Sequence, residues 1–376
     1  MLNKEEISRY SRHLLLPEIG ISGQEKLKAA KVLVIGAGGL GCPALQYLAA
    51  AGVGEIGIID FDKVDISNLQ RQILYNVEDV GKYKAEISAT KLSKQNPLVS
   101  FKVFNSALDT KNALQIISDF DIVIDGTDNF TTRYLVNDAC VILNKPLIYG
   151  SIYRFEGQVS VFNYSSVPNT KSPTYRCLFP VPPSPESSPN CSEIGVLGVL
   201  PGIIGTLQAT ETIKLITGIG EILSGRLLLI NALSMEFITV SLEYNKESNK
   251  NAPQNRDEFL KTDYPLFCGQ AQNTESVKSI SASELLLLLK NKDNLQLLDV
   301  RENGELPIIT ELIDLQIPLS EVENGGDKIS KDKKVIVFCK SGGRSRKAIS
   351  LLEKKYNLNN LYNLEGGVLK FLETKQ

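Results

Sequence analysis

A glycine-rich stretch, GAGGLG at residues 36–41, follows an apolar run that is typical of a strand and opens a helical pattern. Its glycines permit a tight turn and a close backbone approach, and a helix that begins here presents free N–H groups to a phosphate. Asp60 ends the next apolar run, where its carboxylate can accept hydrogen bonds from both ribose hydroxyls. These residues predict a nucleotide site, and a nicotinamide-dependent dehydrogenase fits them as well as an ATP-dependent enzyme does. The glycines that we assign to the nucleotide are Gly36, Gly38, Gly39 and Gly41.

The residues that follow Asp60 favour a triphosphate. The segment DFDKVDISNLQRQIL places Asn68 and Arg71 just beyond the second apolar run, and Lys84 follows in GKYKAE. Two cations and an amide can hold the α and β phosphates and stabilise the charge on departing pyrophosphate, whereas hydride transfer has little use for them. Arg71 or Lys84 alone could instead form a surface ion pair. Because they occur together and in this order, we expect ATP as the ligand.

A second polar motif, DGTDN at residues 125–129, ends the fourth apolar run. This position puts Asp128 and Asn129 at the carboxyl end of a strand, where open α/β sheets bind their ligands. Carboxylate oxygens are the ligands that magnesium prefers, so Asp128 is a candidate to hold the magnesium that accompanies ATP. Its alternative role is to cap the helix that follows.

Two cysteines are candidates for sulfur chemistry. Cys191, in NCSEIGVLGVLPGIIG, lies at the end of a Pro- and Ser-rich loop (165–195) and just before a glycine-rich helix start. Such a position can lower the pKa of a thiol and leave it accessible, which suits a nucleophile. The alternative is a loop cysteine without a function.

Cys339 lies in FCKSGGRSRKA, between an apolar run and a helical pattern. A loop of consecutive backbone N–H groups at a helix N-terminus, reinforced by Arg344, would form an anion cradle that favours a thiolate or a persulfide. A buried cysteine at a strand end is the alternative. The loop that we assign to this chemistry consists of Cys339, Lys340, Ser341, Gly342, Gly343, Arg344 and Ser345.

The elements that position these residues alternate between apolar and amphipathic patterns, which predicts an α/β fold with a Rossmann-like, mostly parallel sheet covered on both faces. The expected strands of its first part are 31–36, 55–60, 100–104 and 121–125. After the loop, the pattern predicts a helix near 201–217 and strands at 226–231 and 235–243.

A polar segment, NKESNKNAPQNRDEF, interrupts the apolar patterns after residue 244 and suggests a linker. We therefore predict a large ATP-binding domain over 1–245, a linker over 246–275 and a small α/β domain over 276–376. The small domain is expected to contain a Leu-rich helix at 283–290 and the strands LQLLDV and KVIVFC.

Composition excludes several classes of protein. Among 376 residues, 41 Lys and Arg nearly balance 43 Asp and Glu, so the chain lacks the basic field of a nucleic-acid binder. No apolar run is long enough to span a membrane, and the first residues do not have a signal-peptide pattern, so we expect a cytoplasmic protein. Six scattered cysteines do not suggest a disulfide framework, and Cys42 and Cys140 fall within helical patterns as packing residues.

Four segments together closely resemble the ubiquitin-activating-type adenylyltransferases that act on sulfur carriers in molybdopterin, thiamine and tRNA-thiolation pathways. The segments are RYSRHLLLPEIG, GAGGLGCPALQYLAAAGVGEIGIIDFDKVDISNLQRQ, GKYKAE and DGTDNFTTRYLVND. The resemblance covers about residues 5–245 and implies that ATP is attacked at its α-phosphate by the C-terminal Gly-Gly carboxylate of a ubiquitin-like sulfur carrier. Besides the four glycines, it implies ATP contacts from Asp60, Asp62, Ser67, Asn68, Arg71, Lys84, Asp128 and Asn129.

The same resemblance carries expectations about assembly and covalent chemistry. Members of the family are homodimers, and the arginine that matches Arg12 reaches the phosphates of the neighbouring subunit. His13, the only histidine, is expected to serve in packing. Members with sulfur chemistry use the cysteine that matches Cys191 to form a thioester or an acyl disulfide with the carrier, although some relatives finish at the adenylate.

The family usually has two CxxC pairs that hold a structural zinc, and here both pairs are incomplete. TYRC keeps Cys177 but has Thr174 at the other position, and PLFC keeps Cys268 but has Pro265. Two thiolates without a nearby histidine argue against a tetrahedral zinc site, so we interpret Cys177 and Cys268 as its remnants.

The C-terminal part resembles the rhodanese domain of sulfurtransferases in FCKSGGRSRKA, LLDVRENGEL and LEGGVLKF. The match covers about 277–376 and implies that Cys339 carries a persulfide. One departure is LQIPLS (315–320), which stands where the family has a histidine-containing stretch.

The two parts together predict an enzyme that adenylates a carrier carboxylate and then delivers sulfur to it, giving a thiocarboxylate. We expect the partners to be a Gly-Gly carrier and a sulfur donor, either a cysteine desulfurase or thiosulfate, and no nucleic acid. The alternatives are an adenylating enzyme with a regulatory or inactive rhodanese domain, a nicotinamide-dependent oxidoreductase, and a scaffold descended from a decayed enzyme.

Overall fold

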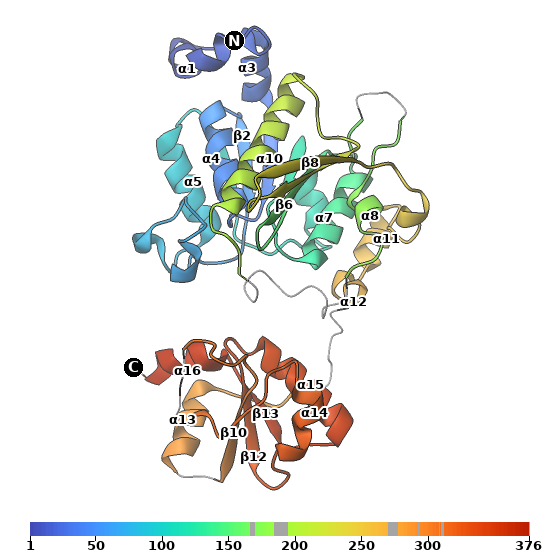
Figure 1. The fold of residues 1–376 in the computed structure, drawn as a ribbon. Helices are drawn as coiled ribbons and strands as arrows, with labels where there is room; N and C mark the ends of the chain where they lie inside the picture. The colour runs from blue at the N-terminus through green and yellow to red at the C-terminus, as the bar shows by residue number, and fades with distance from the viewer. Residues whose placement is uncertain are drawn as a thin grey trace. The chain divides into compact units, whose positions relative to one another are not determined.

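The computed structural model describes residues 1–165, 170–183, 195–269, 277–291, 294–307, 309 and 312–375. The chain divides into two compact units, Met1–Ala271 and Gln272–Gln376. Each unit has a sheet and a core of its own (Figure 1). No helix in these described ranges is both long enough and apolar enough to cross a bilayer.

In the described part of the first unit, the strands form one eight-stranded sheet in the order β3-β2-β1-β4-β5-β6-β7-β8. Strands β1 to β5 run parallel, and β6, β7 and β8 extend the sheet in antiparallel fashion. This arrangement confirms the predicted mostly parallel sheet. The strands are β1 (Lys31–Ile35), β2 (Glu55–Ile59), β3 (Ser100–Phe104), β4 (Ile122–Asp125), β5 (Leu147–Tyr153), β6 (Glu156–Phe162), β7 (Arg226–Asn231) and β8 (Glu236–Ser241).

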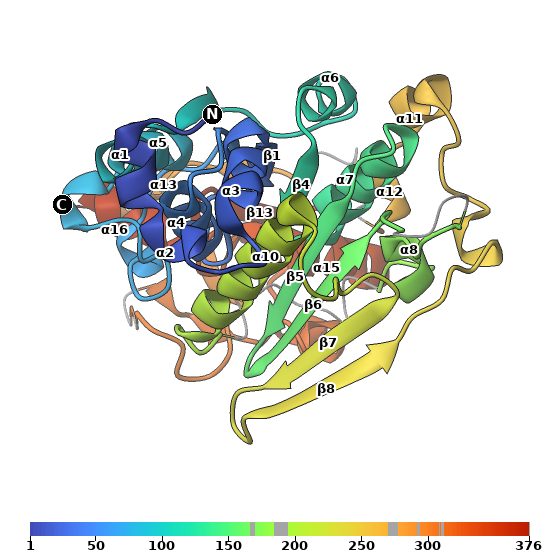
Figure 2. The same ribbon diagram turned by 90° about the horizontal axis from the view of Figure 1, so that it is seen from above.

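Helices cover both faces of this sheet. Successive side chains of a strand point to opposite faces, and in the central strands the residues on both faces are apolar. Val32 and Val34 of β1 point into the core beneath α4, α5 and α10, whereas Leu33 and Ile35 point into the core beneath α6 and α7. Figure 2 shows these helices on opposite sides of β4 and β5. The helices named here are α4 (Gly41–Ala51), α5 (Lys84–Gln95), α6 (Ala113–Ser118), α7 (Phe130–Ile142) and α10 (Leu200–Thr217).

The shorter helices lie at the ends and the edge of the first unit. They are α1 (Lys4–Arg9), α2 (Ser11–Leu14), α3 (Gly20–Ala29), α8 (Tyr175–Leu178), α11 (Arg256–Lys261) and α12 (Tyr264–Phe267). Three 3₁₀ turns, Ile66–Asn68, Val77–Asp79 and Glu247–Asn249, complete the described regular structure of this unit.

The segment that we expected to be a linker, 246–275, belongs to the first unit as far as residue 269. Helices α11 and α12 pack against α7, and Phe259 and Tyr264 are fully buried in the core on that face. The polar composition around these few apolar side chains is what suggested a linker. The burial of two aromatic rings supplies the free energy that holds the segment in place.

A buried ion pair fastens α12 and α8 to α7. The Arg176 guanidinium donates to both carboxylate oxygens of Asp138, at 2.8 and 2.7 Å, and the Tyr264 hydroxyl donates to the same carboxylate at 2.9 Å. The guanidinium also lies over the rings of Tyr134 and Phe267, with 5.1 and 4.7 Å to the ring centroids. All polar contacts of this clamp are therefore made inside the protein, which is the condition for a buried pair to be tolerated.

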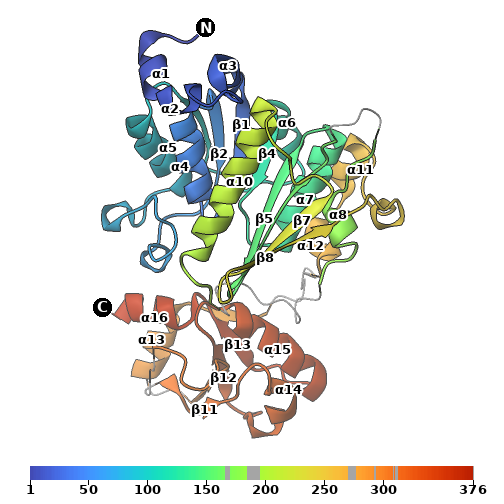
Figure 3. The same cartoon turned by 45° about the horizontal axis from the view of Figure 1, so that its top comes forward.

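In the described part of the second unit, the strands form a parallel sheet in the order β11-β10-β12-β13-β9. Figure 3 shows α13 and α16 on one side of this sheet and α14 and α15 on the other. The strands are β9 (Ser279–Ile280), β10 (Leu295–Asp299), β11 (Leu315–Gln316), β12 (Lys334–Phe338) and β13 (Leu361–Leu364). The helices are α13 (Ala282–Lys290), α14 (Val322–Gly325), α15 (Gly343–Tyr356) and α16 (Gly367–Lys375), with a 3₁₀ turn at Gly326–Lys328.

The clamp makes a stability prediction. Arg176→Ala leaves the Asp138 carboxylate buried without its cation, which costs about 3–5 kcal/mol, so the thermal midpoint of the first unit should fall by many degrees. Lys250→Ala is the control, because Lys250 and Glu247 form an exposed pair, which contributes little. Calorimetry of the full chain measures both variants. Equal midpoints for the two would contradict a stabilising role for the clamp.

Candidate functional site

A cavity of about 460 Å³ lies at the carboxyl ends of the central strands of the first sheet. The strand register explains its position, since Ile35 of β1 stands opposite Ile59 of β2 and opposite Asp125 of β4. The polar residues that follow each strand therefore emerge at the same level. The chain order reverses between β1 and β4, and this is where open α/β sheets bind nucleotides.

The glycine loop forms one wall of the cavity, and its tight course explains why glycine is needed. Gly36 has φ +89°, a conformation that side chains disfavour. A Cβ on Gly41, the first residue of α4, would lie 1.9 Å from the carbonyl oxygen of Gly36. A Cβ on Gly126, at the end of β4, would lie 2.9 Å from that same oxygen. Gly36, Gly38 and Gly39 line the cavity, whereas Gly41 supports the loop from behind.

Asp60 lies at the cavity wall after β2, as predicted for a ribose acceptor. One carboxylate oxygen accepts from the backbone N–H of Ala37 and the other from that of Asp62, both at 2.8 Å. Burial raises the pKa of Asp60, while nearby Lys84 and the two backbone donors oppose that shift. The two N–H groups fix the orientation of the carboxylate and leave each oxygen with a further lone pair for a hydroxyl.

The two predicted cations, Arg71 and Lys84, both line the cavity. The Lys84 side chain is almost fully buried at the start of α5, and its ammonium donates to Asp62 at 2.9 Å. Asp62 is half exposed, so its partner Lys84 is the more buried member of the pair. Arg71 donates to the carbonyl oxygen of Ser67 at 2.9 Å. The arrangement supplies two positive charges beside the glycine loop.

Ser67 and Asn68 lie outside the cavity wall, on the 3₁₀ turn that precedes Arg71. Asp65 caps this turn by accepting from Ser67, and Asn68 accepts from the backbone N–H of Asp65. Their visible role is to shape the turn that carries Arg71, and direct contact of Ser67 or Asn68 with ATP stays a prediction.

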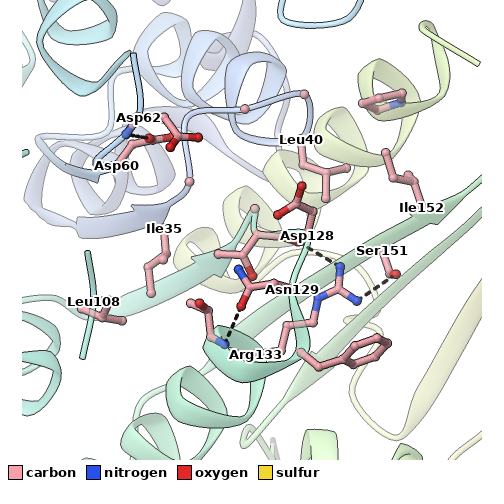
Figure 4. Close-up of a pocket in the computed structure, with 18 of the residues that line it drawn as sticks. Ile35, Leu40, Asp60, Asp62, Leu108, Asp128, Asn129, Arg133, Ser151 and Ile152 are labelled. Carbon is pink, nitrogen blue, oxygen red and sulfur yellow. Dashed lines mark hydrogen bonds between the residues drawn. The ribbon is translucent and has the colours of Figure 1, made fainter. Parts of the chain in front are cut away.

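Asp128 and Asn129 line the cavity at the end of β4, and they have different roles. Asn129 caps α7, because its side chain accepts from the Thr132 N–H at 2.9 Å. Asp128 is exposed and makes no hydrogen bond or ion pair with any other residue in the described ranges. The alternative role of Asp128 as the helix cap therefore belongs to Asn129, and the Asp128 carboxylate points toward the cavity (Figure 4).

Arg133 is a cavity residue that sequence reasoning missed. Its guanidinium is buried, donates to the Thr127 carbonyl at 2.9 Å and to the Ser151 hydroxyl at 3.1 Å, and lies 3.9 Å from Asp125 (Figure 4). Its Nε, the atom nearest Asp125, is buried and makes no hydrogen bond among the described residues. Burial raises the pKa of Asp125, while Arg133 acts to lower it. A signal was present, since an arginine four residues after a helix cap points back toward the end of the preceding strand.

Arg12 and His13 lie on α2, and neither lines this cavity. Arg12 is exposed. His13 meets the side chain of buried Gln24 at 3.0 Å between its Nδ1 and Oε1, and Gln24 in turn donates to the Ala51 carbonyl. His13 thus joins α2 to α3 and α4, consistent with the packing role expected of it.

The cysteines of the first unit differ in accessibility. Cys42 and Cys140 are buried in α4 and α7, as expected, and burial raises the pKa of Cys42 to about 12 and that of Cys140 further still. Such thiols are poor nucleophiles at neutral pH. Cys191 lies outside the residues that the structure describes, so its role stays a prediction.

The two remnants of the zinc pairs are engaged in other contacts. Cys177 accepts from the Asn249 amide at 3.2 Å. Thr174, at the other position of the same incomplete pair, donates its hydroxyl to the side-chain oxygen of Asn249 at 2.7 Å. Cys268 is buried next to the Arg176 clamp, and burial raises its pKa. Across the described ranges, no group of three or more Cys, His, Asp or Glu residues is placed to hold a metal ion.

The second unit places Cys339 between β12 and α15, in the predicted loop. The side chain is 1% exposed, and its sulfur accepts from the Gly342 N–H at 3.1 Å and from the Ser345 hydroxyl at 3.5 Å. Gly342, with φ +95°, turns the chain into the helix. A Cβ on Gly367 would lie 2.4 Å from the Cys339 carbonyl, so the LEGG turn also closes tightly on this loop.

Arg344, expected to reinforce the anion cradle, is engaged by a carboxylate. Its guanidinium donates to both oxygens of Glu305, at 2.8 and 2.5 Å, from the loop after β10. This hydrogen bonding holds the pKa of Glu305 below its usual value, so Glu305 is ionised at neutral pH. The sulfur therefore receives its described hydrogen bonds from one backbone N–H and one hydroxyl, and Arg344, paired with Glu305, contributes less net positive charge than the loop sequence suggested.

Comparison with known proteins gives independent information on both units. Residues 10–252 match the ThiF family, and residues 281–374 match the Rhodanese-like domain. The chain is 43% identical over 381 aligned residues to the "probable adenylyltransferase/sulfurtransferase MoeZ" of Mycobacterium tuberculosis, covering 100% of this chain and 95% of that protein. It is 48% identical over 266 residues to the "sulfur carrier protein adenylyltransferase" of Thermus thermophilus, covering 71% of this chain and 98% of that one.

Among solved structures, the chain is similar to E. coli MccB crystallised with ATP. The TM-score is 0.55 at 26% sequence identity, and the likeness covers 65% of this chain and 73% of MccB.

The glycine loop makes a testable prediction. Gly41→Ala should abolish measurable ATP binding in titration calorimetry, because its Cβ would meet the Gly36 carbonyl and force the loop to move. Gly202→Ala is the matched control, since a Cβ there, in α10, meets nothing within 4 Å. Wild-type affinity in the Gly41 variant would show that the loop course is unimportant for the nucleotide.

Proposed function

The chain belongs to the ThiF family, and from this premise we propose that its substrate is the C-terminal Gly-Gly carboxylate of a ubiquitin-like sulfur-carrier protein. The chain is an adenylyltransferase with a rhodanese-like sulfurtransferase domain, as its two family matches and its full-length relatives indicate. ThiF adenylyltransferases use ATP. Nothing in the cavity favours the nicotinamide-dependent alternative, because cations stand where a hydride-transfer site has no need of them.

One observation carries the adenylation proposal. A backbone cradle, a ribose-type carboxylate and two cations converge on a single cavity at the strand ends. We assign the phosphates to the glycine loop, Arg71 and Lys84, and the ribose to Asp60. The carrier carboxylate then attacks the α-phosphorus, and pyrophosphate leaves with the electron pair of the broken P–O bond. The two cations stabilise the negative charge that develops on the departing oxygens.

Asp128 is the residue that we propose to hold magnesium. Its carboxylate is exposed at the cavity and has no partner in the described ranges. Magnesium is commonly bound by one or two carboxylates together with phosphate oxygens of the substrate. The ion supplies further charge neutralisation for the phosphates. Arg133, fixed by Thr127 and Ser151, holds the backbone on which Asp128 stands.

The sulfur step that we propose uses Cys339. A persulfide on Cys339 attacks the acyl carbon of the adenylate, AMP leaves with the electron pair of the C–O bond, and an acyl disulfide forms. Cys191 thiolate then attacks the Cys339 sulfur, which releases the carrier thiocarboxylate and leaves a Cys191–Cys339 disulfide for an external thiol to reduce. Alternatively, Cys191 takes the acyl group first.

Further parts of the proposal concern assembly and context. We propose a cytoplasmic homodimer in which Arg12 of one subunit reaches the phosphates held by its neighbour, because exposed Arg12 lies outside the cavity of its own chain. The sulfur donor is a cysteine desulfurase or thiosulfate. The thiocarboxylate serves a molybdopterin, thiamine or tRNA-thiolation pathway.

Lys84→Met tests the adenylating half. The variant removes one of the two charges that stabilise departing pyrophosphate, so carrier-dependent exchange of pyrophosphate into ATP should slow by about 100-fold or more. Lys94→Met is the matched control on the same helix, because Lys94 is exposed and outside the cavity. Exchange at the wild-type rate in the Lys84 variant would show that Lys84 does not stabilise the departing pyrophosphate.

Glu305→Gln tests how charge at the second site selects the donor. A neutral amide holds Arg344 less strongly, so the guanidinium can turn to a dianion, and the KM for thiosulfate should fall about tenfold. Glu302→Gln is the control, an acidic residue of the same loop that does not pair with Arg344. An unchanged or higher KM would mean that the ion pair supports the loop rather than competing with the donor.

A further inference from the structure

Asn363 is a fully buried polar residue that the sequence analysis did not single out. It lies in β13, next to β12, and its backbone N–H donates to the Lys278 carbonyl at 2.7 Å. A buried amide is retained at low cost only where each of its polar atoms finds a partner. The partners of the Asn363 side chain all belong to the Cys339 loop and the first turn of α15.

These partners fix which way the amide faces. With its nitrogen toward the loop, Asn363 donates to the Ser345 hydroxyl oxygen at 2.6 Å and to the Gly342 carbonyl at 3.1 Å, while its oxygen accepts from Arg346 Nε at 3.3 Å. The opposite orientation would set oxygen against the Gly342 carbonyl and nitrogen against the Arg346 donor. Orientation follows from the network, and only the first choice satisfies every atom.

The orientation determines where the Ser345 proton goes. Because the Ser345 oxygen already accepts from Asn363, its own O–H is available to donate to the Cys339 sulfur, 3.5 Å away. The bond to the Gly342 carbonyl holds Gly342, whose own N–H, on the other side of its Cα, donates to the same sulfur at 3.1 Å. Asn363 thus contacts both residues that donate to the sulfur without touching the sulfur itself.

We propose that Asn363 is a positioning residue for the sulfur chemistry of Cys339: it orients the Ser345 hydroxyl toward the sulfur, fixes the position of Gly342, whose N–H donates to the sulfur, and so stabilises the anionic form of the sulfur. The proposal rests on the proposed role of Cys339 as the sulfur carrier. Cys339 is 1% exposed, so its sulfur has little water to stabilise a negative charge, and these donors must replace that water. The contribution of Arg344 is offset by Glu305, which makes the two neutral donors more important.

The test compares sulfur reactivity with fold stability in the full-length protein. The rate of Cys339 alkylation by iodoacetamide is measured by peptide mass spectrometry, at a pH where the rate still rises with pH, for Asn363→Ala, Ser345→Ala and the double variant. Asn360→Ala is the matched control, because Asn360 also donates its side-chain amide to two backbone carbonyls, those of Ser330 and Lys333, in the same unit. Thermal midpoints are recorded for all variants.

We expect Asn363→Ala and Ser345→Ala each to slow alkylation by about threefold to tenfold. Because both act through one network, the double variant should be slowed much less than the product of the two single slowings. Asn360→Ala should lower the thermal midpoint without slowing alkylation. Asn363→Asp, which keeps the side-chain volume but offers Ser345 only acceptors, gives the same slowing if Asn363→Ala does not fold. Wild-type alkylation in the Asn363 variants, or losses that multiply fully, would overturn the proposal.

Failure of the Asn363 proposal can be distinguished from failure of the proposed function of Cys339. Alkylation reports the state of the sulfur whether or not a donor charges it, whereas the mass of the Cys339 peptide after exposure to thiosulfate or to a protein persulfide reports sulfur uptake. A wild-type protein that takes up no sulfur from either donor contradicts the proposed function of Cys339. The alkylation series still decides the role of Asn363.

Discussion

The candidate nucleotide site depends on how closely two stretches of backbone approach each other where β1 and β4 end. Gly36, Gly41 and Gly126 meet at this point, and a Cβ on Gly41 or Gly126 would lie within 3 Å of the Gly36 carbonyl. Because these strands stand in register with β2, the same contact brings Asp60 and Asp128 to the two sides of one cavity. The course of the glycine loop and the positions of the two carboxylates therefore both depend on the close backbone contact among these glycines.

The second unit has the same strand–turn–helix arrangement around Cys339. A parallel strand ends, a glycine with positive φ turns the chain, and the N-terminus of a helix presents its N–H groups to an anion. In the first unit we propose that this anion is a phosphate of ATP, and in the second that it is the sulfur of Cys339. The cations differ in kind, since Lys84 pairs with a half-exposed aspartate, whereas Arg344 is held by both oxygens of Glu305.

Strands β1 to β4, β7 and β8, the mostly parallel character of the first sheet and the glycine loop could be predicted from sequence because they depend on local patterns and spacing, whereas β5, β6 and the strand order were not predicted. The role of Asn363 could not be predicted, since it comes from Ser345 on another element. For Arg133 the sequence indicated only its position four residues after a helix cap, and its partner Ser151 lies on another element. The segment around Phe259 read as a linker because its burial depends on α7, far away in the chain. Arg344 fits the cradle pattern, but its charge is offset by Glu305, which lies 39 residues earlier.

The central claim is that adenylation in the first unit and sulfur transfer from Cys339 in the second act on the same carrier terminus. The most direct measurement is the intact mass of a Gly-Gly-ending carrier after incubation with ATP, magnesium, a sulfur donor and either the wild-type enzyme or Cys339→Ala. The account predicts conversion to the thiocarboxylate with the wild type only, while both proteins still release pyrophosphate. A Cys339→Ala enzyme that makes the thiocarboxylate at the normal rate would contradict it.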